Sequence, residues 1–446
     1  MARHLLYITN GFPGDLYTEK VFVGLELEAL RARFDKIVLV PIENMPRRAG
    51  YADQLPDSVS VDWTIADNHT IHSRVLKLAG GIADPFVLQS LRLMAGEAHT
   101  IAQWRAGLFQ AVNTALIARL ISRILKRHDF TPDNTVLLSL WFHNAAAATA
   151  LLAEKEGWKV AIHAHTSDIY DERMPFRSQR VRDRLLNSVG RVLTISRHGL
   201  DYLRNRFPRH ADKFMLGRLG SMRLYNPHLA SSKHTHADCV ELLTIARLSP
   251  EKRLDLIMDV LAKCAAANHD KRVRWTIIGD GPLVEQLQLK KVSLSVPNFE
   301  VIFEGMQPNQ QIQKRLSEMP PDWLIMLSYS EGIPISMGEA MSYGIPVITT
   351  DVGSIGELVN SESALLLPRD LSADEFAGHI APLLFDSARR DKMSEAALRQ
   401  WQEIFDSSVL AERNADAISA LLRKESATET CEPPRQTVRR NQSVDF

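Results

Sequence analysis

Two glutamates, Glu331 and Glu339, lie in a segment whose other residues suit a phosphate-bearing ligand. Pro334 favours the first turn of a helix, which places Glu331 in the loop before that helix and Glu339 inside it. Gly332 lets the backbone approach a ligand closely, and the unpaired N–H groups at a helix start suit phosphate oxygens. We therefore predict that Glu339 and the loop Glu331-Gly332-Ile333-Pro334 bind one ligand. Surface carboxylates around a tight turn are the alternative.

Two cations, Arg247 and Lys252, follow the apolar run Leu243-Thr244-Ile245-Ala246. A guanidinium fork and a mobile ammonium group can together stabilise the charge that develops on a departing nucleoside diphosphate. Solvated loop charges are the alternative for each cation taken alone, but the helix start after Pro334 favours the diphosphate interpretation. The segment Gly279-Asp280-Gly281-Pro282 is a weaker signal, because it fits an ordinary turn as well as a nucleotide loop, and we interpret it as scaffold near the ligand.

In the first half of the chain, His165 and Asp168 follow the apolar run that ends at Ala164, which places both at a strand end. Structural hydrogen-bonded histidines are the alternative, more strongly for His163 than for His165. A metal site is not predicted, because no third ligand stands at suitable spacing and the chain contains no Asp-x-Asp pair. No cofactor is expected.

These residues need parallel sheets to hold them. Apolar runs alternate with helical patterns along the chain, which predicts an α/β protein with doubly wound parallel sheets. The expected strands are 5–9, 37–41, 136–139, 160–164, 191–195, 240–246, 273–278, 300–303, 323–327 and 346–349. The expected helices include 18–31, 254–267, 282–290 and, within 85–127, an insertion whose role the sequence does not reveal.

The sequence divides into two such domains. A polar run, Ser231-Ser232-Lys233-His234-Thr235-His236, resembles a linker, so we predict a first domain over 1–230 and a second over 238–400. The stretch 426–446 carries few apolar residues and is expected to be a disordered tail. Ligands of doubly wound sheets bind outside the carboxyl ends of the strands, so the chemistry is expected in a cleft between the two domains.

The amino-acid composition limits the kinds of partner that the chain is expected to bind. With 53 basic and 53 acidic residues among 446, the chain lacks the basic excess of a nucleic-acid-binding protein, and we predict no nucleic-acid partner. No segment reaches about 18 uncharged apolar residues, so no bilayer crossing is expected, and a cytoplasmic protein is predicted.

A local charge excess stands out in residues 171–210, which hold ten Arg against four Asp or Glu, an excess of six. Such a stretch suits contact with an anionic membrane surface or a lipid diphosphate, and a solvated helix face is an alternative of nearly equal weight. A peripheral position on the inner face of the cytoplasmic membrane would follow from the first interpretation.

Taken together, these motifs resemble the retaining glycosyltransferases called family 4, which adopt the arrangement of two Rossmann-like domains named GT-B. The resemblance spans nearly the whole chain and implies that Arg247 and Lys252 bind the diphosphate of a nucleotide-sugar donor. It also implies that Glu331 begins the family's Glu-x7-Glu stretch at the sugar and that Glu339 holds the ribose hydroxyls. The catalytic set would be Glu331, Arg247, Lys252 and His165.

The resemblance also covers the acceptor domain. His165 with Asp168-Ile169-Tyr170 is similar to the family's His-x-x-Asp-x-Tyr stretch, so His165 and Asp168, with Gly14, are expected on the acceptor side. The runs 8–13, 18–19 and 327–334 resemble bacterial enzymes that build exopolysaccharide, capsule or lipopolysaccharide, which implies a glycan or lipid-linked acceptor. Residues 401–425 look like the helices by which such chains cross back onto the first domain.

For the reaction, the resemblance implies retention of anomeric configuration without a metal, by substitution on the face from which the diphosphate leaves. Two loop features depart from the family. Arg218-Leu219-Gly220-Ser221 stands where many relatives have Asn-Gly-Val-Asp, and Arg253 stands where relatives often have Gly. A GT-B-like nucleotide-sugar epimerase and an inactive sugar-nucleotide-binding scaffold are the rival interpretations.

Overall fold

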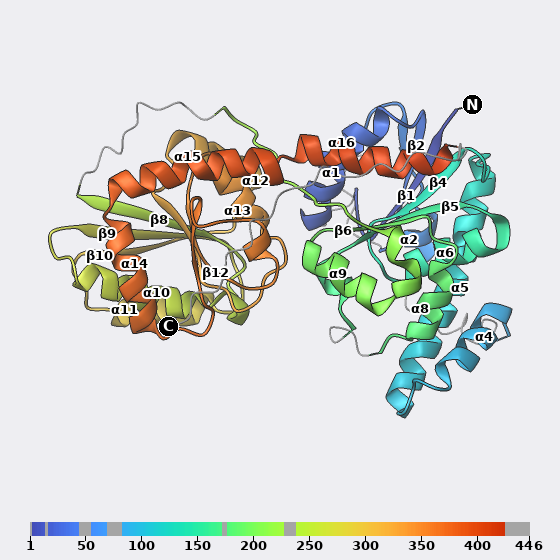
Figure 1. Cartoon of the computed structure of the whole chain (residues 1–446), viewed down its shortest axis with the longest axis horizontal. Helices are drawn as coiled ribbons and strands as arrows, with labels where there is room; N and C mark the ends of the chain where they lie inside the picture. The colour runs from blue at the N-terminus through green and yellow to red at the C-terminus, as the bar shows by residue number, and fades with distance from the viewer. Residues whose placement is uncertain are drawn as a thin grey trace, which may run out of the picture.

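The computed structural model describes residues 2–13, 17–43, 55–68, 83–171, 176–226 and 238–423, which form two α/β units (Figure 1). The first unit is built on a seven-stranded sheet of order β3-β2-β1-β4-β5-β6-β7, and the second on a six-stranded sheet of order β10-β9-β8-β11-β12-β13. All the strand pairs that form these sheets are parallel. The predicted α/β class with two doubly wound parallel sheets is therefore confirmed.

The first sheet carries helices on both faces, so its strands are almost continuously apolar and buried. Its strands are β1 His4–Thr9, β2 Lys36–Pro41, β3 Val59–Val61, β4 Thr135–Ser139, β5 Lys159–Ala164, β6 Arg191–Thr194 and β7 Phe214–Leu216. Its helices are α1 Tyr17–Arg31, α2 Thr64–Asn68, α4 Pro85–Met94, α5 Ile101–Arg127, α6 Asn144–Glu156, α7 Thr166–Ile169, α8 Gln179–Leu186, α9 Arg197–Arg206 and η3 Pro208–Lys213.

The second unit repeats this plan. Its strands are β8 Cys239–Ile245, β9 Arg272–Ile278, β10 Phe299–Gly305, β11 Trp323–Met326, β12 Val347–Thr350 and β13 Ala364–Leu367. Its helices are η4 Pro250–Lys252, α10 Leu254–Ala266, α11 Val284–Ser293, α12 Asn309–Glu318, α13 Ile335–Ser342, η5 Ile355–Glu357, α14 Ala373–Leu384 and α15 Ser387–Ile404.

The chain passes between the units twice, and the two passages touch. After α15 it enters α16 Ser407–Ser419, whose Ala411, Ala415 and Ile418 pack in the core of the first unit, and it ends in η6 Ala420–Leu422 (Figure 1). Phe405 still belongs to the core of the second unit, so the return crossing lies at Phe405 and Asp406. The outward passage lies beside it, where Ser221 N donates to Phe405 O at 2.9 Å.

These contacts bear on three predicted segments. Trp401 packs in the core of the second unit, so the helix that crosses back begins a few residues later than the expected 401–425. The linker run 231–236 and the tail 426–446 lie outside the described residues.

Helix α5 lies in the expected 85–127 insertion and projects with α4 from the first unit (Figure 1). A Thr100–Gln103 capping box begins it. By length and hydropathy it is the one helix in the described part of the chain that could cross a membrane. Slightly more than half of its most apolar 18-residue window, 56%, is buried inside the unit, as expected for a core helix.

Candidate active site

The second sheet has a topological switch point between β8 and β11. From β8 the chain adds β9 and β10 on one side, and it then returns to place β11 on the other side of β8. Loops after the two strands that flank such a point diverge and leave a crevice at the carboxyl edge of the sheet. The loop after β8 carries Arg247 and Lys252, and the loop after β11 carries Glu331, so the structure brings the predicted residues to this edge.

Glu331 is buried at this edge of the second sheet. Its Oε1 accepts hydrogen bonds from Lys252 Nζ and Ser328 Oγ, each at 2.6 Å. Its Oε2 has no hydrogen-bond partner among the described residues, so one carboxylate oxygen remains able to accept from a ligand hydroxyl. The loop is held from behind by Gly353, whose φ is +58° and at which a Cβ would lie 2.0 Å from the Glu331 carbonyl oxygen.

The two cations differ in their surroundings. Lys252 Nζ is engaged by Glu331, but an ammonium group has three donors, and two remain for other oxygens. Arg247 is exposed and makes no ion pair with a described residue. Gly279 supports this loop, because its backbone packs against Ala246 so closely that a Cβ would lie 1.9 Å from the Ala246 carbonyl oxygen.

Arg253 accounts for one of the departures noted from the sequence. Its φ is +49°, a left-handed conformation that glycine adopts most easily. Its side chain donates to Leu327 O at 2.6 Å and to Arg369 O at 2.9 Å, and so ties the loop after β8 to the end of β11. The backbone of Arg253 is thus strained, and its side chain makes two hydrogen bonds that a glycine at this position would lack.

Glu339 lies inside α13, and Pro334 is the residue immediately before that helix, so the predicted division between loop and helix is confirmed. Asn309 Nδ2 and Gln313 Nε2, both from α12, donate to Glu339 Oε1. Its Oε2 has no hydrogen-bond partner among the described residues. Burial raises the pKa of Glu339 to about 7, although both amide donors oppose that rise.

This pKa predicts how stability depends on pH. A carboxyl group whose pKa is higher in the folded than in the unfolded chain stabilises the fold below its unfolded pKa, and this contribution is lost as pH rises through about 7. Glu339→Gln stays neutral, so we expect its melting temperature relative to wild type to rise between about pH 5 and 8. Thermal unfolding across that range is the measurement. Glu285→Gln, on the exposed face of α11, is the matched control and should show no such trend; a flat Glu339→Gln difference would contradict the burial argument.

The first sheet has an equivalent switch point between β1 and β4. His165 and Asp168 lie at its carboxyl edge, just after β5, and both are buried. Asp168 accepts from His165 N at 2.6 Å and from Phe142 N at 2.8 Å, and its pKa is raised to about 7 by burial. Burial lowers the pKa of His165 to about 3, so its ring is neutral. The Trp141 ring lies 4.3 Å from it between centroids. Gly14 lies outside the described residues.

Sequence reasoning gave no role to Glu19, which holds the loop after β1. Its carboxylate accepts backbone N–H groups of Asn10, Gly11 and Phe12 at 2.7–3.0 Å, and Trp141 Nε1 at 2.5 Å. It therefore joins the loops after β1 and β4 across the switch point. His163 is a structural histidine, as the alternative held, because its Nε2 lies 2.9 Å from buried Glu26.

A second feature that the sequence did not reveal joins the two units. Glu357 of the second unit accepts the backbone N–H groups of Arg197 and His198, each at 2.7 Å, at the first turn of α9 in the first unit. The same carboxylate pairs with Arg218 at 3.3 Å. An anion at a helix N-terminus is stabilised by the helix dipole, so Glu357 holds the two units in this relative position.

Among the described residues, no group of three or more His, Cys, Asp or Glu side chains could hold a metal ion. The polar groups at both sheet edges are instead carboxylates, cations and backbone amides. These groups suit the binding of phosphates and hydroxyls.

Comparison with known proteins points to one family. Residues 232–400 match the profile of the family described as glycosyl transferases group 1. WcaL of Escherichia coli K12, which carries the name of a colanic acid biosynthesis glycosyltransferase, is 25% identical over 227 residues, 47% of this chain and 52% of that protein. The lipopolysaccharide 1,6-galactosyltransferase of Salmonella typhimurium LT2 is 34% identical over 149 residues, 31% of this chain and 38% of that protein.

The fold has a wider match. The crystal structure of Anabaena HepE in complex with UDP superposes with a TM-score of 0.66 and covers 94% of this chain and 100% of that one, at 16% identity. That likeness concerns the fold, and it identifies the two-unit arrangement as GT-B. The chain aligns with about half or less of the length of these curated relatives.

Proposed function

We propose that the chain transfers a sugar from a nucleotide-sugar donor to a glycan or lipid-linked acceptor, because residues 232–400 match the profile of the glycosyl transferases group 1 family. The proposed reaction retains the anomeric configuration and serves the assembly of bacterial surface polysaccharide. The names of WcaL and the Salmonella galactosyltransferase support the polysaccharide class.

One observation carries this proposal. At the switch point of the second sheet, Lys252 contacts Glu331, Arg247 lies on the same loop as Lys252, and Glu339 lies on the helix that follows Glu331. Each carboxylate keeps one oxygen without a described partner. Arg247 and the remaining donors of Lys252 would stabilise the departing diphosphate. Glu331 would accept a hydroxyl of the transferred sugar, and Glu339 would accept the ribose hydroxyls.

The first unit would supply the acceptor. His165 is neutral and buried beside Trp141, so its role would be to hydrogen-bond and orient an acceptor rather than to carry charge. Catalysis would then depend on positioning and on charge stabilisation at the leaving group, without a protein nucleophile.

The test is a thermal-shift panel of UDP-, GDP- and ADP-sugars, because a bound donor stabilises the folded chain by mass action. UDP-sugars come first, since HepE was solved with UDP. The stabilising donor is then incubated with and without extracts containing glycans and lipid-linked saccharides, and the products are separated. Acceptor-dependent sugar transfer supports the proposal. Donor conversion without any acceptor would favour an epimerase, and binding without turnover on any acceptor would favour an inactive scaffold.

We also propose that the first unit contacts an anionic membrane surface. Among the described arginines of the stretch 171–210, five are exposed, namely Arg180, Arg197, Arg204, Arg206 and Arg209. Each basic residue near such a surface contributes about 1 kcal/mol. Flotation with anionic liposomes at low salt should therefore recover the chain. The double variant Arg180→Gln, Arg209→Gln should bind on the order of tenfold less well, and Arg399→Gln, Arg413→Gln on the other exposed helices should not. No flotation of the wild type would contradict the proposal.

A further inference from the structure

The first unit contains a cavity of about 520 Å³ between α4, α5, α6 and α8. This volume lies in the range of small-molecule sites, about 300–1,000 Å³. Its walls are mostly apolar and include Phe86, Met94, Ile117, Val181 and Leu185. The cavity extends to Thr9 and Asn10, at the carboxyl edge of the sheet. The cavity is therefore continuous from the sheet edge, where the acceptor is proposed to bind, into an apolar interior. A sugar alone would not fill that interior.

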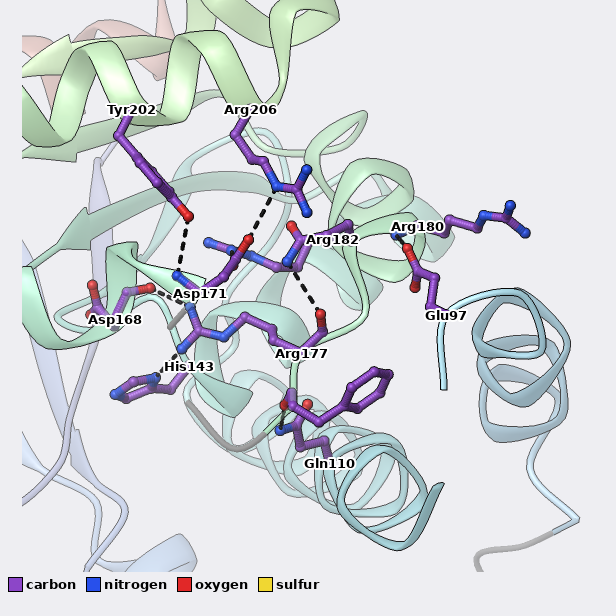
Figure 2. A network of polar contacts seen from close by, with 12 residues as sticks. Glu97, Gln110, His143, Asp168, Asp171, Arg177, Arg180, Arg182, Tyr202 and Arg206 are labelled. Atoms are coloured by element: carbon purple, nitrogen blue, oxygen red, sulfur yellow. Dashed lines mark hydrogen bonds and ion pairs between the residues drawn. The ribbon is translucent and has the colours of Figure 1, made fainter. Parts of the chain in front are cut away.

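Two arginines that the proposed reaction does not use line the polar end of this cavity (Figure 2). Arg182 is only 8% exposed. Its Nη1 donates to Asp171 at 3.1 Å, while its Nη2 is buried and has no hydrogen-bond partner among the described residues. Arg177 donates to the backbone oxygen of Asp168 and contacts His143, but it forms no ion pair with a described carboxylate.

The charge of this pair is poorly compensated. Asp171 is shared between Arg182 and Arg206. Asp168 lies near both Arg177 and Arg182 but forms an ion pair with neither in the described chain, and burial raises its pKa to about 7. Burial, and next the proximity of Arg177, lower the pKa of Arg182 to about 9, and burial also lowers the pKa of Arg177. One buried and one half-buried cation in such surroundings would be stabilised by an anion bound between them.

Helix α6 starts at the same end of the cavity. Its N-cap residue, His143, makes no side-chain capping bond, and the first bond of the helix runs from Ala147 N to His143 O. Asn144 and Ala145 line the cavity, so the unpaired amides of the first turn adjoin the arginine pair. A helix start next to two arginines is suited to phosphate oxygens.

We propose that this cavity binds a lipid phosphate, with its hydrocarbon chain among the apolar residues and its phosphate on Arg177, Arg182 and the first turn of α6. The proposal rests on the proposed function, because the lipid would be the carrier of the acceptor sugar. Phe109 lines the cavity and is 40% exposed, so it lies at an opening on α5 through which a chain can enter. Leu88 on α4 and Ile101 on α5 are further exposed apolar side chains of the helices that enclose the cavity.

The test measures binding to the full chain without donor, by titration calorimetry. Farnesyl diphosphate is the probe. Farnesol is the same molecule without its diphosphate, and inorganic pyrophosphate is the diphosphate without the hydrocarbon chain. We expect farnesyl diphosphate to bind at least about tenfold more tightly than either. Equal binding of pyrophosphate would overturn the proposal, because the hydrocarbon part of the cavity would contribute nothing.

Variants separate the two ends of the cavity. Arg177→Gln and Arg182→Gln should each weaken farnesyl diphosphate binding about tenfold or more, while Arg123→Gln, at an exposed position of α5, should not. Ala106 lies at a half-buried position of α5 and lines the cavity, so Ala106→Phe would narrow the cavity. This variant should weaken farnesyl diphosphate binding with both arginines intact. It keeps the test decisive if an arginine variant fails to fold. Unchanged affinity in Arg177→Gln and Ala106→Phe would overturn the proposal. The rise in melting temperature that UDP causes, measured on every variant, reports on the donor site separately. If UDP did not raise the melting temperature of the wild type, that result would count against the proposed function alone.

Discussion

Alanine at Arg247 or at Lys252 is expected to lower kcat/KM by on the order of 10²-fold or more, the usual scale for losing a group that stabilises developing charge. Both side chains lie at the carboxyl edge of the second sheet, where a departing diphosphate would need them. Lys252→Ala should have the larger effect, because it also removes the ion-pair partner of buried Glu331. Steady-state kinetics with varied donor is the measurement.

The matched control for these cations is Lys291→Ala, an exposed lysine at the end of α11, which should retain wild-type kinetics. Circular dichroism should show folded chains in all three variants. Wild-type rates in both Arg247→Ala and Lys252→Ala would rule out the diphosphate assignment.

The second large effect should separate the two carboxylates. Glu331 is proposed to contact the transferred sugar, where charge changes during the reaction, whereas Glu339 is proposed to contact the ribose, which does not react. Glu331→Gln should therefore lower kcat strongly with a modest change in donor KM, and Glu339→Gln should chiefly raise donor KM. Kinetics with varied donor at saturating acceptor, with direct titration of the nucleoside diphosphate, distinguish the two losses.

A pH series adds an independent check on Glu339. Its pKa of about 7 means that the carboxyl is increasingly protonated as pH falls below neutrality. A protonated carboxyl loses acceptor capacity toward the ribose hydroxyls, so donor affinity of the wild type should fall over that range, and that of Glu339→Gln should not. If Glu331→Gln kept the wild-type kcat while Glu339→Gln lost it, the roles proposed for the two glutamates would have to be exchanged.

The fold was largely predictable because its strands are buried on both faces. Uninterrupted apolar runs such as those at β1, β4 and β9 can be recognised from sequence, and they were found within one or two residues. The three strands missed, β3, β7 and β13, are short and lie at the edges of the sheets. An edge strand of three or four residues leaves too short a pattern to separate it from a loop.

The placement of Glu331 in a loop and of Glu339 in the helix after it was predictable, because both lie in one short segment with a proline between them. The candidate site was not predictable where partners come from distant parts of the chain. Glu19 joins two loops because Trp141, 122 residues away, lies beside it in the folded chain. Arg182 is an ordinary residue of a basic helix in the sequence, and only packing between α6 and α8 buries its guanidinium beside a cavity. The local charge excess of 171–210 thus mixes buried and exposed arginines.

The contact between Ser221 and Phe405 fixes how the two units can move. Because both connections cross between the units at one place, that place can act as a hinge about which the units rotate, while translation of one unit away from the other would require both connections to stretch. Gly220 sets the close spacing of the two connections, since a Cβ there would lie 2.2 Å from the Phe405 carbonyl oxygen. Any rotation would displace the residues farthest from this hinge most, and Ser221 and its neighbours least.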